Sequence, residues 1–325
     1  MRSVPLRCEP PDLDLDSPRG AGVYAQFLLA GLEHEGQFEL TRDRNAALLS
    51  LDGRFRGNGG RPSLTALIDL SHIFARRNMS PRQWLRRNLS VAFAARRSSA
   101  LVVPSEAVEH GLRRYLGVDP SRIVVVEPRA RPAFKRLGRL EVTSLRRELG
   151  LAAPYVIFVG TKSGRKNLPT LQRAFMAAAG GLEPRPQLIL AGEGKSGLDG
   201  VREMGFIPLT QLPGLLSGAL AYVNPSFWEG SSIGAEEAMA CGTPALVSAR
   251  GALPKAVEGG GLALDPEAEG DWVEALSALF RTPSLRSELS LGALGRSLAL
   301  RAQAPDWSRV GQLLGALPEP AAEAG

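Results

Sequence analysis

The feature that most constrains this chain is an alternation of short apolar runs and helical segments in its C-terminal half. The runs are rich in aliphatic and β-branched side chains and are bounded by Pro, Gly or polar turns. They are Tyr155–Val159, Gln187–Ala191, Leu220–Asn224 and Pro244–Ser248, with helical spacing over Leu168–Ala179 and Glu236–Ala240 between them. Strands that alternate with helices over about 110 residues predict βαβ units around a buried parallel sheet.

The N-terminal half repeats this pattern more weakly. Strands are predicted at Leu64–Ile68, Ala100–Val103 and Arg122–Val126, and helices from Gly20 to about Glu33 and over Pro81–Arg97. The opening segment from Val4 to Cys8 is a poor strand candidate, because two prolines follow it. At 325 residues the chain is long enough for two α/β domains. The polar, charged stretch from Leu137 to Gly150 marks the expected boundary between them.

Cysteine content and hydropathy indicate the compartment. Cys8 and Cys241 are the only cysteines, and they fit no disulfide or metal-ligand spacing. No run approaches the roughly 18–20 apolar residues that a membrane span needs. The segment Met1–Pro11 lacks the apolar core of a signal peptide. We therefore expect a cytoplasmic protein.

The net charge of +6 is unevenly distributed along the chain. Residues 71–140 carry 15 Lys or Arg against 4 Asp or Glu, a local balance of +11, which leaves 6 − 11 = −5 for the rest. One interpretation is a surface that meets lipid headgroups or phosphorylated groups at the inner face of the membrane. Its interfacial face would combine apolar side chains and arginines: Trp84, Leu85 and Leu89 with Arg82, Arg86 and Arg87. The alternative is that these apolar residues pack inward and that the arginines decorate ordinary solvated helix faces. Nucleic-acid binding ranks last, because no recognition module is present.

The most informative segment for chemistry runs from Asn224 to Pro244. It passes from a strand end through a Gly-containing loop into a helix, which in an open α/β sheet is where ligands bind. The free N–H groups and the dipole of a helix start favour an anion such as a diphosphate. Glu229 lies at the loop entrance, and Glu237 lies eight residues further on. A carboxylate at Glu237 can accept hydrogen bonds from two neighbouring sugar hydroxyls, although paired Glu residues are also common on exposed helices.

This segment resembles the signature of family-4 retaining glycosyltransferases (glycosyl transferases group 1). The shared features are a strand ending in Pro-Ser, then Glu-Gly, a second Glu, and Ala-Met-Ala-Cys-Gly-Thr-Pro. Three further blocks resemble the family in order and spacing: Phe158–Leu168, Leu188–Gly192, and Gly205–Pro208 with Leu212-Pro213. The resemblance is strong over about 155–266 and fainter over 68–134.

The resemblance implies the GT-B fold: an α/β protein with two Rossmann-like domains whose parallel sheets face a central cleft. The acceptor-side domain would cover residues 1–140 and the nucleotide-sugar donor domain residues 141–300. Residues 301–325 would form a terminal helix that crosses back to the first domain, followed by a disordered tail.

The resemblance also implies roles for individual residues. Glu229 would lie near the donor sugar, while Lys166, with Arg165 beside it, would neutralise the leaving diphosphate. Glu237 would hold the ribose hydroxyls of the donor. Backbone groups would face the phosphates at Gly160, at Ser231, Ser232, Ile233 and Gly234, and at the N-terminal pair Gly20 and Gly22. No Asp-x-Asp pattern occurs near these blocks, so we expect no metal and no cofactor, with a UDP- or GDP-sugar as substrate.

The sequence departs from the family pattern at two places. Thr161 stands where many members carry Arg after the first strand, and Arg165 is expected to supply that charge. The His-Asp pair of the acceptor domain is replaced by Ile68-Asp69, with His72 three residues after Asp69. His72 either replaces the missing histidine or is an ordinary surface residue.

These observations predict a retaining glycosyltransferase of cell-envelope or exopolysaccharide synthesis. Its partners would be a nucleotide sugar and a saccharide or lipid-linked acceptor that the sequence does not name. The alternative is a non-catalytic sugar-nucleotide-binding or scaffold homologue with a degenerate N-terminal domain, as the substitution at Ile68 suggests.

Overall fold

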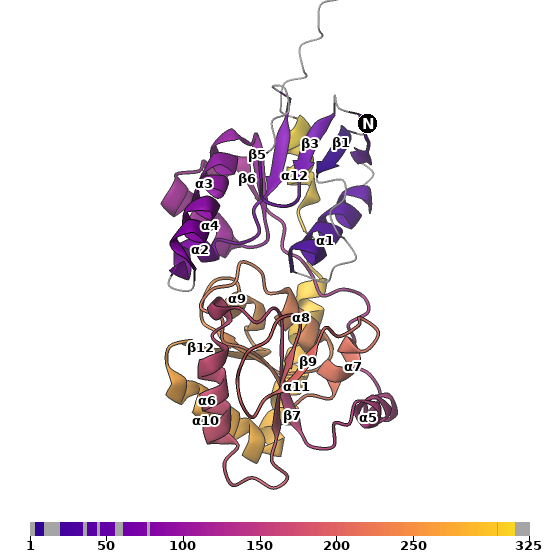
Figure 1. Cartoon of the computed structure of the whole chain (residues 1–325). Helices are drawn as coiled ribbons and strands as arrows, with labels where there is room; N and C mark the ends of the chain where they lie inside the picture. The colour runs from indigo at the N-terminus through magenta and orange to yellow at the C-terminus, as the bar shows by residue number, and fades with distance from the viewer. Residues whose placement is uncertain are drawn as a thin grey trace, which may run out of the picture. The chain divides into compact units, whose positions relative to one another are not determined.

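The apolar runs of the sequence form the strands of two six-stranded parallel sheets in a computed structural model of the chain. The structure describes residues 4–9, 20–34, 38–43, 46–55, 61–76, 79–303 and 305–315. The chain divides into unit 1, which comprises residues 1–128 and 304–325, and unit 2, which comprises residues 129–303 (Figure 1). An α/β fold with two parallel sheets, as expected, is confirmed.

Unit 1 is built on a sheet with the strand order β2-β1-β3-β4-β5-β6. Its strands are β1 (Val4–Glu9), β2 (Phe38–Leu40), β3 (Ala47–Ser50), β4 (Ser63–Ala66), β5 (Ala100–Val103) and β6 (Ile123–Val125). Its helices are α1 (Gly20–His34), α2 (Ser71–Phe74), α3 (Pro81–Arg97), α4 (Glu106–Leu116) and α12 (Trp307–Gly315). The opening segment, expected to be a poor strand, is β1 and lies between β2 and β3 inside the sheet.

Alternation of side chains along the strands of unit 1 supplies apolar residues to both faces of its sheet. Leu64 and Val102 pack in one core with α1 and α12, whereas Leu101 and Val103 pack in another with α3 and α4. Figure 1 shows α2, α3 and α4 together on one side of this sheet, with α1 and α12 on the other. This two-sided burial explains why the strands are apolar throughout rather than alternating with polar residues.

Unit 2 is built on a sheet with the strand order β12-β11-β10-β7-β8-β9. Its strands are β7 (Tyr155–Val159), β8 (Gln187–Ala191), β9 (Arg202–Gly205), β10 (Ala221–Asn224), β11 (Ala245–Ser248) and β12 (Gly261–Leu264). Its helices are α5 (Arg139–Glu148), α6 (Leu168–Ala178), α7 (Leu212–Ser217), α8 (Ile233–Ala240), α9 (Leu253–Val257), α10 (Glu269–Arg281) and α11 (Pro283–Arg301).

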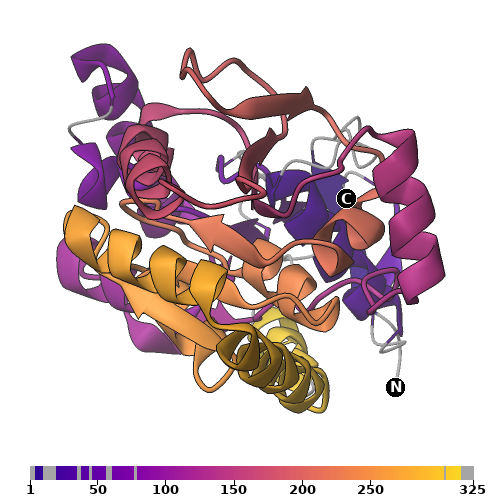
Figure 2. The ribbon, with the colours of Figure 1, turned by 90° about the horizontal axis from the view of Figure 1, so that it is seen from below.

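The helices of unit 2 cover both faces of its sheet. Val156 and Phe158 contribute to a core with α6 and α10, whereas Tyr155 and Ile157 contribute to a core with α7, α8, α9 and α11. Figures 1 and 2 show α6 and α10 on one side of this unit and α5 on the other, where α5 packs against α7. The chain runs from β7 outward to β9, returns to β10, and then runs outward in the opposite direction to β12. The order therefore reverses between β7 and β10.

The two points at which the chain passes between the units differ slightly from the expected boundaries. The first passage follows residue 128 rather than residue 140, and the second follows residue 303 rather than residue 300. The charged stretch expected to mark the boundary contains α5, and Leu145 packs against Gly214 of α7 within unit 2. Helix α12 belongs to unit 1, where Trp307 packs on Phe27. The expected disordered tail lies outside the described residues.

Among the described residues, no helix is both long enough and apolar enough to cross a bilayer.

Candidate functional site

The strand order of unit 2 identifies one edge of its sheet as the place to look for a site. In open parallel sheets, ligands bind beyond the carboxyl ends of the strands where the strand order reverses. In unit 2 these strands are β7 and β10, which pair with each other in the middle of the sheet. The basic loop of residues 160–167 follows β7, and the signature loop of residues 225–232 follows β10. The two segments singled out in the sequence therefore leave the sheet at the same point.

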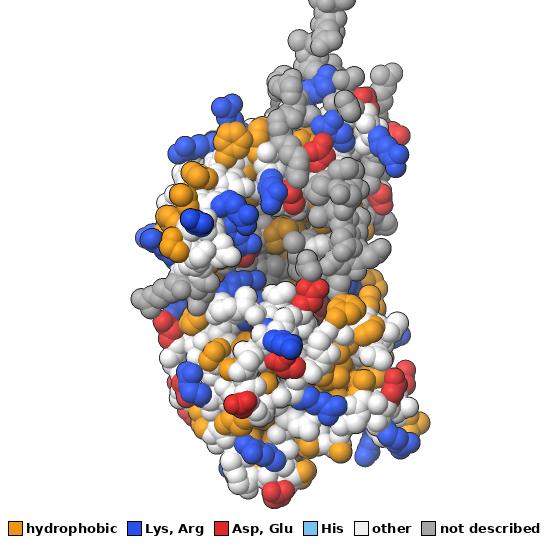
Figure 3. All heavy atoms as spheres, in the orientation of Figure 1, with side chains coloured by type: hydrophobic (Ala, Val, Ile, Leu, Met, Phe, Trp, Pro, Cys, Tyr) orange, Lys and Arg blue, Asp and Glu red, His pale blue; other side chains and the backbone are white. Residues whose placement is uncertain are grey.

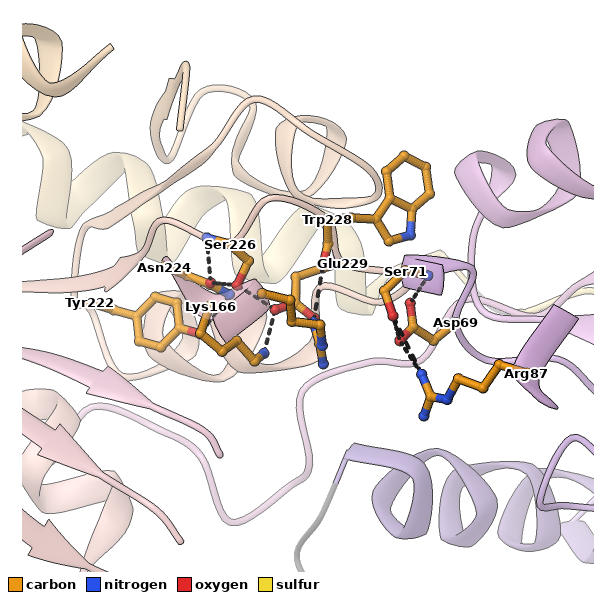
Figure 4. Close-up of polar contacts among 10 residues, drawn as sticks. Asp69, Ser71, Arg87, Lys166, Tyr222, Asn224, Ser226, Trp228 and Glu229 are labelled. Atoms are coloured by element: carbon orange, nitrogen blue, oxygen red, sulfur yellow. Dashed lines mark hydrogen bonds and ion pairs between the residues drawn. The ribbon is translucent and has the colours of Figure 1, made fainter. Parts of the chain in front are cut away.

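Glu229 is the centre of a buried polar cluster at this point (Figure 4). Its carboxylate accepts a hydrogen bond from Arg165 Nη1 at 2.8 Å through Oε2, and forms an ion pair with Lys166 Nζ through Oε1. The Ser226 hydroxyl lies 2.6 Å from the same Oε1 atom and 2.5 Å from Asn224 Oδ1. The residues expected to be catalytic, Glu229, Lys166 and Arg165, are thus in direct contact.

Electrostatics fix the protonation state of this cluster. Burial raises the pKa of the Glu229 carboxyl, but the adjacent charges of Lys166 and Arg165 outweigh burial and lower that pKa to about 2. Glu229 is therefore ionised throughout the physiological range. Two cations contact one carboxylate among the described residues, and Lys166 is only 7% exposed. A mostly buried cluster that contains two cations is suited to an anionic ligand.

Backbone geometry on both sides of the cluster holds it in place. Asn167 adopts the left-handed conformation with φ 53°, and its side-chain amide donates to Pro266 O at 2.7 Å. This turn fixes Lys166 at the end of its loop, and Asn tolerates that conformation better than most residues. On the other side, Gly251 has φ +65° and approaches so closely that a Cβ atom would lie 2.1 Å from Glu229 O. Only glycine fits at that position.

Glu237 lies on α8, the helix that follows the signature loop. It is almost fully buried, and its Oε1 atom accepts a hydrogen bond from Arg131 Nε at 2.6 Å. The pKa of the Glu237 carboxyl is raised, because burial outweighs the opposing effects of the Arg131 guanidinium and backbone N–H. Sequence reasoning missed Arg131, because no motif surrounds it and it lies 106 residues from its partner.

The remaining donor-binding candidates of unit 2 surround the same strand ends. Gly160 directly follows β7, and its N–H donates to Ala191 O at 3.0 Å. The segment at the start of α8 contains Ser231, Ser232, Ile233 and Gly234. As at any helix start, the first N–H groups lack acceptors in a preceding helical turn. The Ser231 hydroxyl oxygen is buried and has no hydrogen-bond partner within the described part of the chain. An unsatisfied buried hydroxyl is costly, so this loop is suited to a ligand that supplies a partner.

The candidates of unit 1 have different surroundings. Gly20 and Gly22 lie in the first turn of α1 instead of in a loop, and residues 10–19 before them are outside the described residues.

In unit 2, Thr161, which occupies the position of the family's Arg, is exposed, while Arg165 from the same loop reaches the Glu229 cluster.

His72 is not a surface residue, and that alternative was wrong. Its side chain, on α2, is only 1% exposed. Burial lowers the pKa of His72, and Arg87 adds to this effect while Asp69 opposes it. The neutral imidazole is therefore favoured, and its Nδ1 atom has no hydrogen-bond partner among the described residues. Asp69 itself accepts hydrogen bonds from the N–H and hydroxyl of Ser71, at 2.8 and 2.7 Å (Figure 4).

Within the described ranges, no group of three or more His, Cys, Asp or Glu residues lies together in the manner of a metal site.

Comparison with known sequences finds proteins that are similar to the part of the chain that contains this site. Residues 153–282 match the family model "Glycosyl transferases group 1", a range that contains both the basic loop and the signature. The chain is 32% identical to a D-inositol 3-phosphate glycosyltransferase of Pseudarthrobacter chlorophenolicus, over 63% of this chain and 51% of that protein. It is 33% identical to the O-antigen chain mannosyltransferase B of Escherichia coli, over 38% of this chain and 35% of that protein. The chain thus spans at most about half the length of these two curated relatives.

Comparison with solved structures concerns the whole chain. Anabaena Alr3699/HepE, in complex with UDP and glucose, aligns with a TM-score of 0.72 at 16% identity, covering 97% of this chain and 99% of that one. WaaG, a glycosyltransferase involved in lipopolysaccharide biosynthesis, aligns with a TM-score of 0.70 at 13% identity, covering 96% and 99%. The chain therefore has the GT-B fold of these proteins, and residues 153–282 are similar to group 1 glycosyl transferases.

Proposed function

We propose that this protein is a retaining glycosyltransferase that moves a sugar from a UDP- or GDP-sugar to an acceptor. The observation that carries the proposal is the buried contact of Lys166 and Arg165 with Glu229 at the point where the strand order of unit 2 reverses. The match of residues 153–282 to group 1 glycosyl transferases supports it. The UDP and UDP-glucose complexes of Anabaena HepE support a nucleotide-sugar donor.

The residues of the cluster would act mainly on the leaving group. When the bond between sugar and phosphate breaks, negative charge develops on the departing nucleotide diphosphate. Lys166 and Arg165 are already fixed by Glu229, so they can stabilise that charge without reorganising. The start of α8 adds N–H dipoles directed at the same anion. Glu229 would contact the donor sugar while it holds both cations in place.

We propose that no metal ion takes part, because two protein cations supply the charge that a divalent ion would otherwise provide. Activity is expected to survive treatment with EDTA. Loss of activity in EDTA that Mg²⁺ or Mn²⁺ restores would contradict this part of the proposal. Retention is tested separately by NMR, as the anomeric configuration of the product compared with that of the donor.

The central test is a panel of UDP- and GDP-sugars with the purified protein. We expect binding of at least one donor, with slow hydrolysis or transfer. Lys166→Ala should lower turnover by about two to three orders of magnitude, as removal of one transition-state charge partner typically does. Arg173→Ala is a matched control, because Arg173 is an exposed cation of unit 2 paired with Glu269 on the helix surface. It should leave turnover unchanged.

Two outcomes would separate this proposal from the alternative. No interaction with any donor would reject the enzyme. Nucleotide binding without turnover under every acceptor would favour a non-catalytic sugar-nucleotide-binding or scaffold homologue, which the Ile68 substitution suggests. The O-antigen relative in Escherichia coli supports a role in cell-envelope or exopolysaccharide synthesis, with a saccharide or lipid-linked acceptor.

We further propose that the protein acts in the cytoplasm and contacts the anionic inner face of the membrane through α3. Three large apolar side chains of this helix face solvent: Leu85, Leu89 and Phe93 are 51%, 62% and 52% exposed. At 100° per residue they share one side of the helix with Arg82, Arg86 and Arg96, which are also exposed. No Asp or Glu occurs between Asp69 and Glu106. Figure 3 shows hydrophobic and basic side chains interspersed on the α3 and α4 side of unit 1.

This outward face differs from the one expected from the sequence. Trp84 turns to the other side of α3, where the Arg76 guanidinium lies 4.3 Å from its ring centroid. Arg87 lies 3.9 Å from Asp69. The face that remains combines aliphatic and aromatic groups with arginines, which is typical of helices that lie in a membrane interface. Leucine side chains cannot form hydrogen bonds or ion pairs with the phosphates of a nucleic acid. The composition of this face therefore favours a lipid surface as the partner over a nucleic acid.

Vesicle flotation tests this contact. The protein should float at low salt with vesicles that contain phosphatidylglycerol, but not with pure phosphatidylcholine. Leu85→Ser with Leu89→Ser should abolish flotation. Leu291→Ser with Leu298→Ser is the matched control, because both leucines are 68% exposed on α11, and it should have no effect. Equal loss in both double variants, or binding to duplex DNA in place of vesicles, would reject the membrane contact.

A further inference from the structure

Arg131 and Glu237 form a charge pair that no sequence motif contains. Arg131 lies two residues after the start of unit 2, in the segment between β6 and α5, whereas Glu237 lies in the middle of α8. Their Nε–Oε1 distance is 2.6 Å, and the side chains are 21% and 8% exposed. An ion pair with so short a distance and so little exposure is a fixed contact of the fold, unlike the transient contacts of mobile surface side chains.

An aromatic ring holds the guanidinium of Arg131, and a second arginine holds the backbone beside it. Its Cζ atom lies 4.9 Å from the ring centroid of Phe134, a residue with no exposed surface. The backbone around it is held by Arg301 of α11, which donates to Phe134 O at 2.7 Å and to Arg131 O at 3.4 Å. A stacked and anchored guanidinium presents its N–H group in one direction, and here that direction is the Glu237 carboxylate.

Glu237 needs this partner because of its surroundings. Ala235, Ala238 and Met239 of the same helix are buried apolar residues. In such surroundings, desolvation favours the neutral carboxylic acid. A neutral acid carries a proton on one oxygen and accepts hydrogen bonds less well than a carboxylate, which accepts at both oxygens.

We propose that Arg131 is a positioning residue of the donor site, which favours the ionised form of Glu237 and orients its carboxylate to accept hydrogen bonds from the ribose hydroxyls of the donor. This inference rests on the proposed function for its ligand and on the contacts above for its geometry. Arg131 acts through Glu237 and does not itself touch the donor.

The other titratable or charged groups near Glu237 cannot replace Arg131. Tyr222 on β10 and Cys241 at the end of α8 are close enough for the Glu237 charge to affect them, and burial keeps both in their neutral forms by raising their pKa values. Glu236, the preceding residue on α8, is buried, and a carboxyl group cannot supply a positive charge. Arg301 and Arg296 of α11 donate to backbone carbonyls, and Lys255 of α9 is exposed. Glu229 belongs to the neighbouring cluster and is itself an anion.

The experiment measures binding of UDP and GDP between pH 5.5 and 8.5, by calorimetry on the full chain. Binding to the wild type should depend less on pH than binding to Arg131→Gln. Arg131→Gln should weaken binding about tenfold or more at pH 5.5, and affinity should recover as the pH rises and Glu237 ionises. The sign follows from burial, since without its cation Glu237 stays protonated to a higher pH. Arg131→Lys keeps the charge and should restore most of the affinity at low pH.

Two comparisons separate positioning from a general structural role. In a Glu237→Gln background, Arg131→Gln should have no further effect on binding and no effect on its pH dependence. With the 2′,3′-dideoxy form of the nucleotide, the wild type and Arg131→Gln should bind equally weakly. An Arg131→Gln defect that is equal at every pH, or that persists in either comparison, would overturn the inference.

A direct measurement keeps this inference distinct from the proposed function. The Glu237 carboxyl carbon, assigned with the Glu237→Gln variant, can be titrated by ¹³C NMR in glutamate-labelled protein. Its midpoint should move to higher pH in Arg131→Gln. If the wild type bound no nucleotide, the proposed function would fail, while an unmoved midpoint would reject the role of Arg131 on its own.

Discussion

At the scale of single residues, the ionised carboxylate of Glu229 stabilises the fold as well as holding the cations of the site in place. Its pKa falls from 4.5 to about 2 in the folded chain, because Lys166 and Arg165 outweigh its burial. A carboxyl with a lowered folded pKa stabilises the fold above its unfolded pKa, and this stabilisation is lost as the pH falls through the folded value. The shift corresponds to about 3 kcal/mol at neutral pH.

We therefore expect Glu229→Gln to lower the free energy of unfolding by about 3 kcal/mol at pH 7, since two buried cations lose their counter-charge. The difference from the wild type should shrink as the pH falls from about 4.5 toward 2. Urea denaturation at pH 7 and pH 3 measures both values. Glu267→Gln, at an exposed carboxylate, is the control and should change neither. A deficit of the same size at both pH values would show that Glu229 is not stabilised by its charge.

The sequence predicted residues of the site where a local motif carries them. Lys166, Arg165 and Glu229 fall in two short blocks, and the structure brings them into contact. Arg131 could not be found in this way, because its partner is 106 residues away and only the packed fold brings them together. The burial of His72 was also missed, since a four-residue helix leaves too little periodicity to show which side faces inward.

At the scale of elements, Gly251 ties the loop after β11 to the loop that carries Glu229. Ala252 N donates to Glu229 O at 2.9 Å, and no Cβ fits at Gly251. We expect Gly251→Ala to lower the free energy of unfolding by more than about 2 kcal/mol and to weaken nucleotide binding, because the Glu229 loop must move. The strain of a non-glycine residue at positive φ alone accounts for about 1–2 kcal/mol.

Gly259→Ala is the matched control for this substitution. Gly259 has φ +74°, and nothing lies within 4 Å of the place that a Cβ atom would occupy. It should cost only the backbone strain and leave nucleotide binding unchanged. Thermal unfolding and UDP titration of both variants make the comparison. Equal effects on binding would show that the close approach of Gly251 does not position the Glu229 loop.

Prediction of elements succeeded where burial on both faces makes a run apolar. The bounds of β5, β7 and β8 and of α3 are those predicted. β9 and β12 were not predicted because they are only partly buried, and β2 because it has three residues. These three are edge strands, which face less of the core. β3 was also not predicted, although it is a buried strand inside its sheet, because its run of four residues is too short to stand out. The charged stretch taken as a boundary contains a helix, because a surface helix needs few apolar residues to dock.

At the scale of the whole molecule, each unit has its own large buried tryptophan. Trp307 of α12 packs against Phe27 and closes over Gly31 in unit 1, whereas Trp272 of α10 is fully buried in unit 2. We expect Trp307→Ala to destabilise unit 1 by about 3–5 kcal/mol while unit 2 keeps its stability. Trp272→Ala should have the reverse effect. Hydrogen exchange followed peptide by peptide measures both, and a uniform loss of protection in both units would show that the two cores are not independent.

The return of α12 to unit 1 has a consequence for the order of events on the ribosome. Unit 2 is one continuous stretch, but unit 1 needs residues 1–128 together with a helix that is translated only after unit 2. Its core therefore stays open beside α1 until translation has passed the whole of unit 2. The second unit to be translated can be the first to finish folding, and the nascent N-terminal half must be kept from aggregating in the meantime.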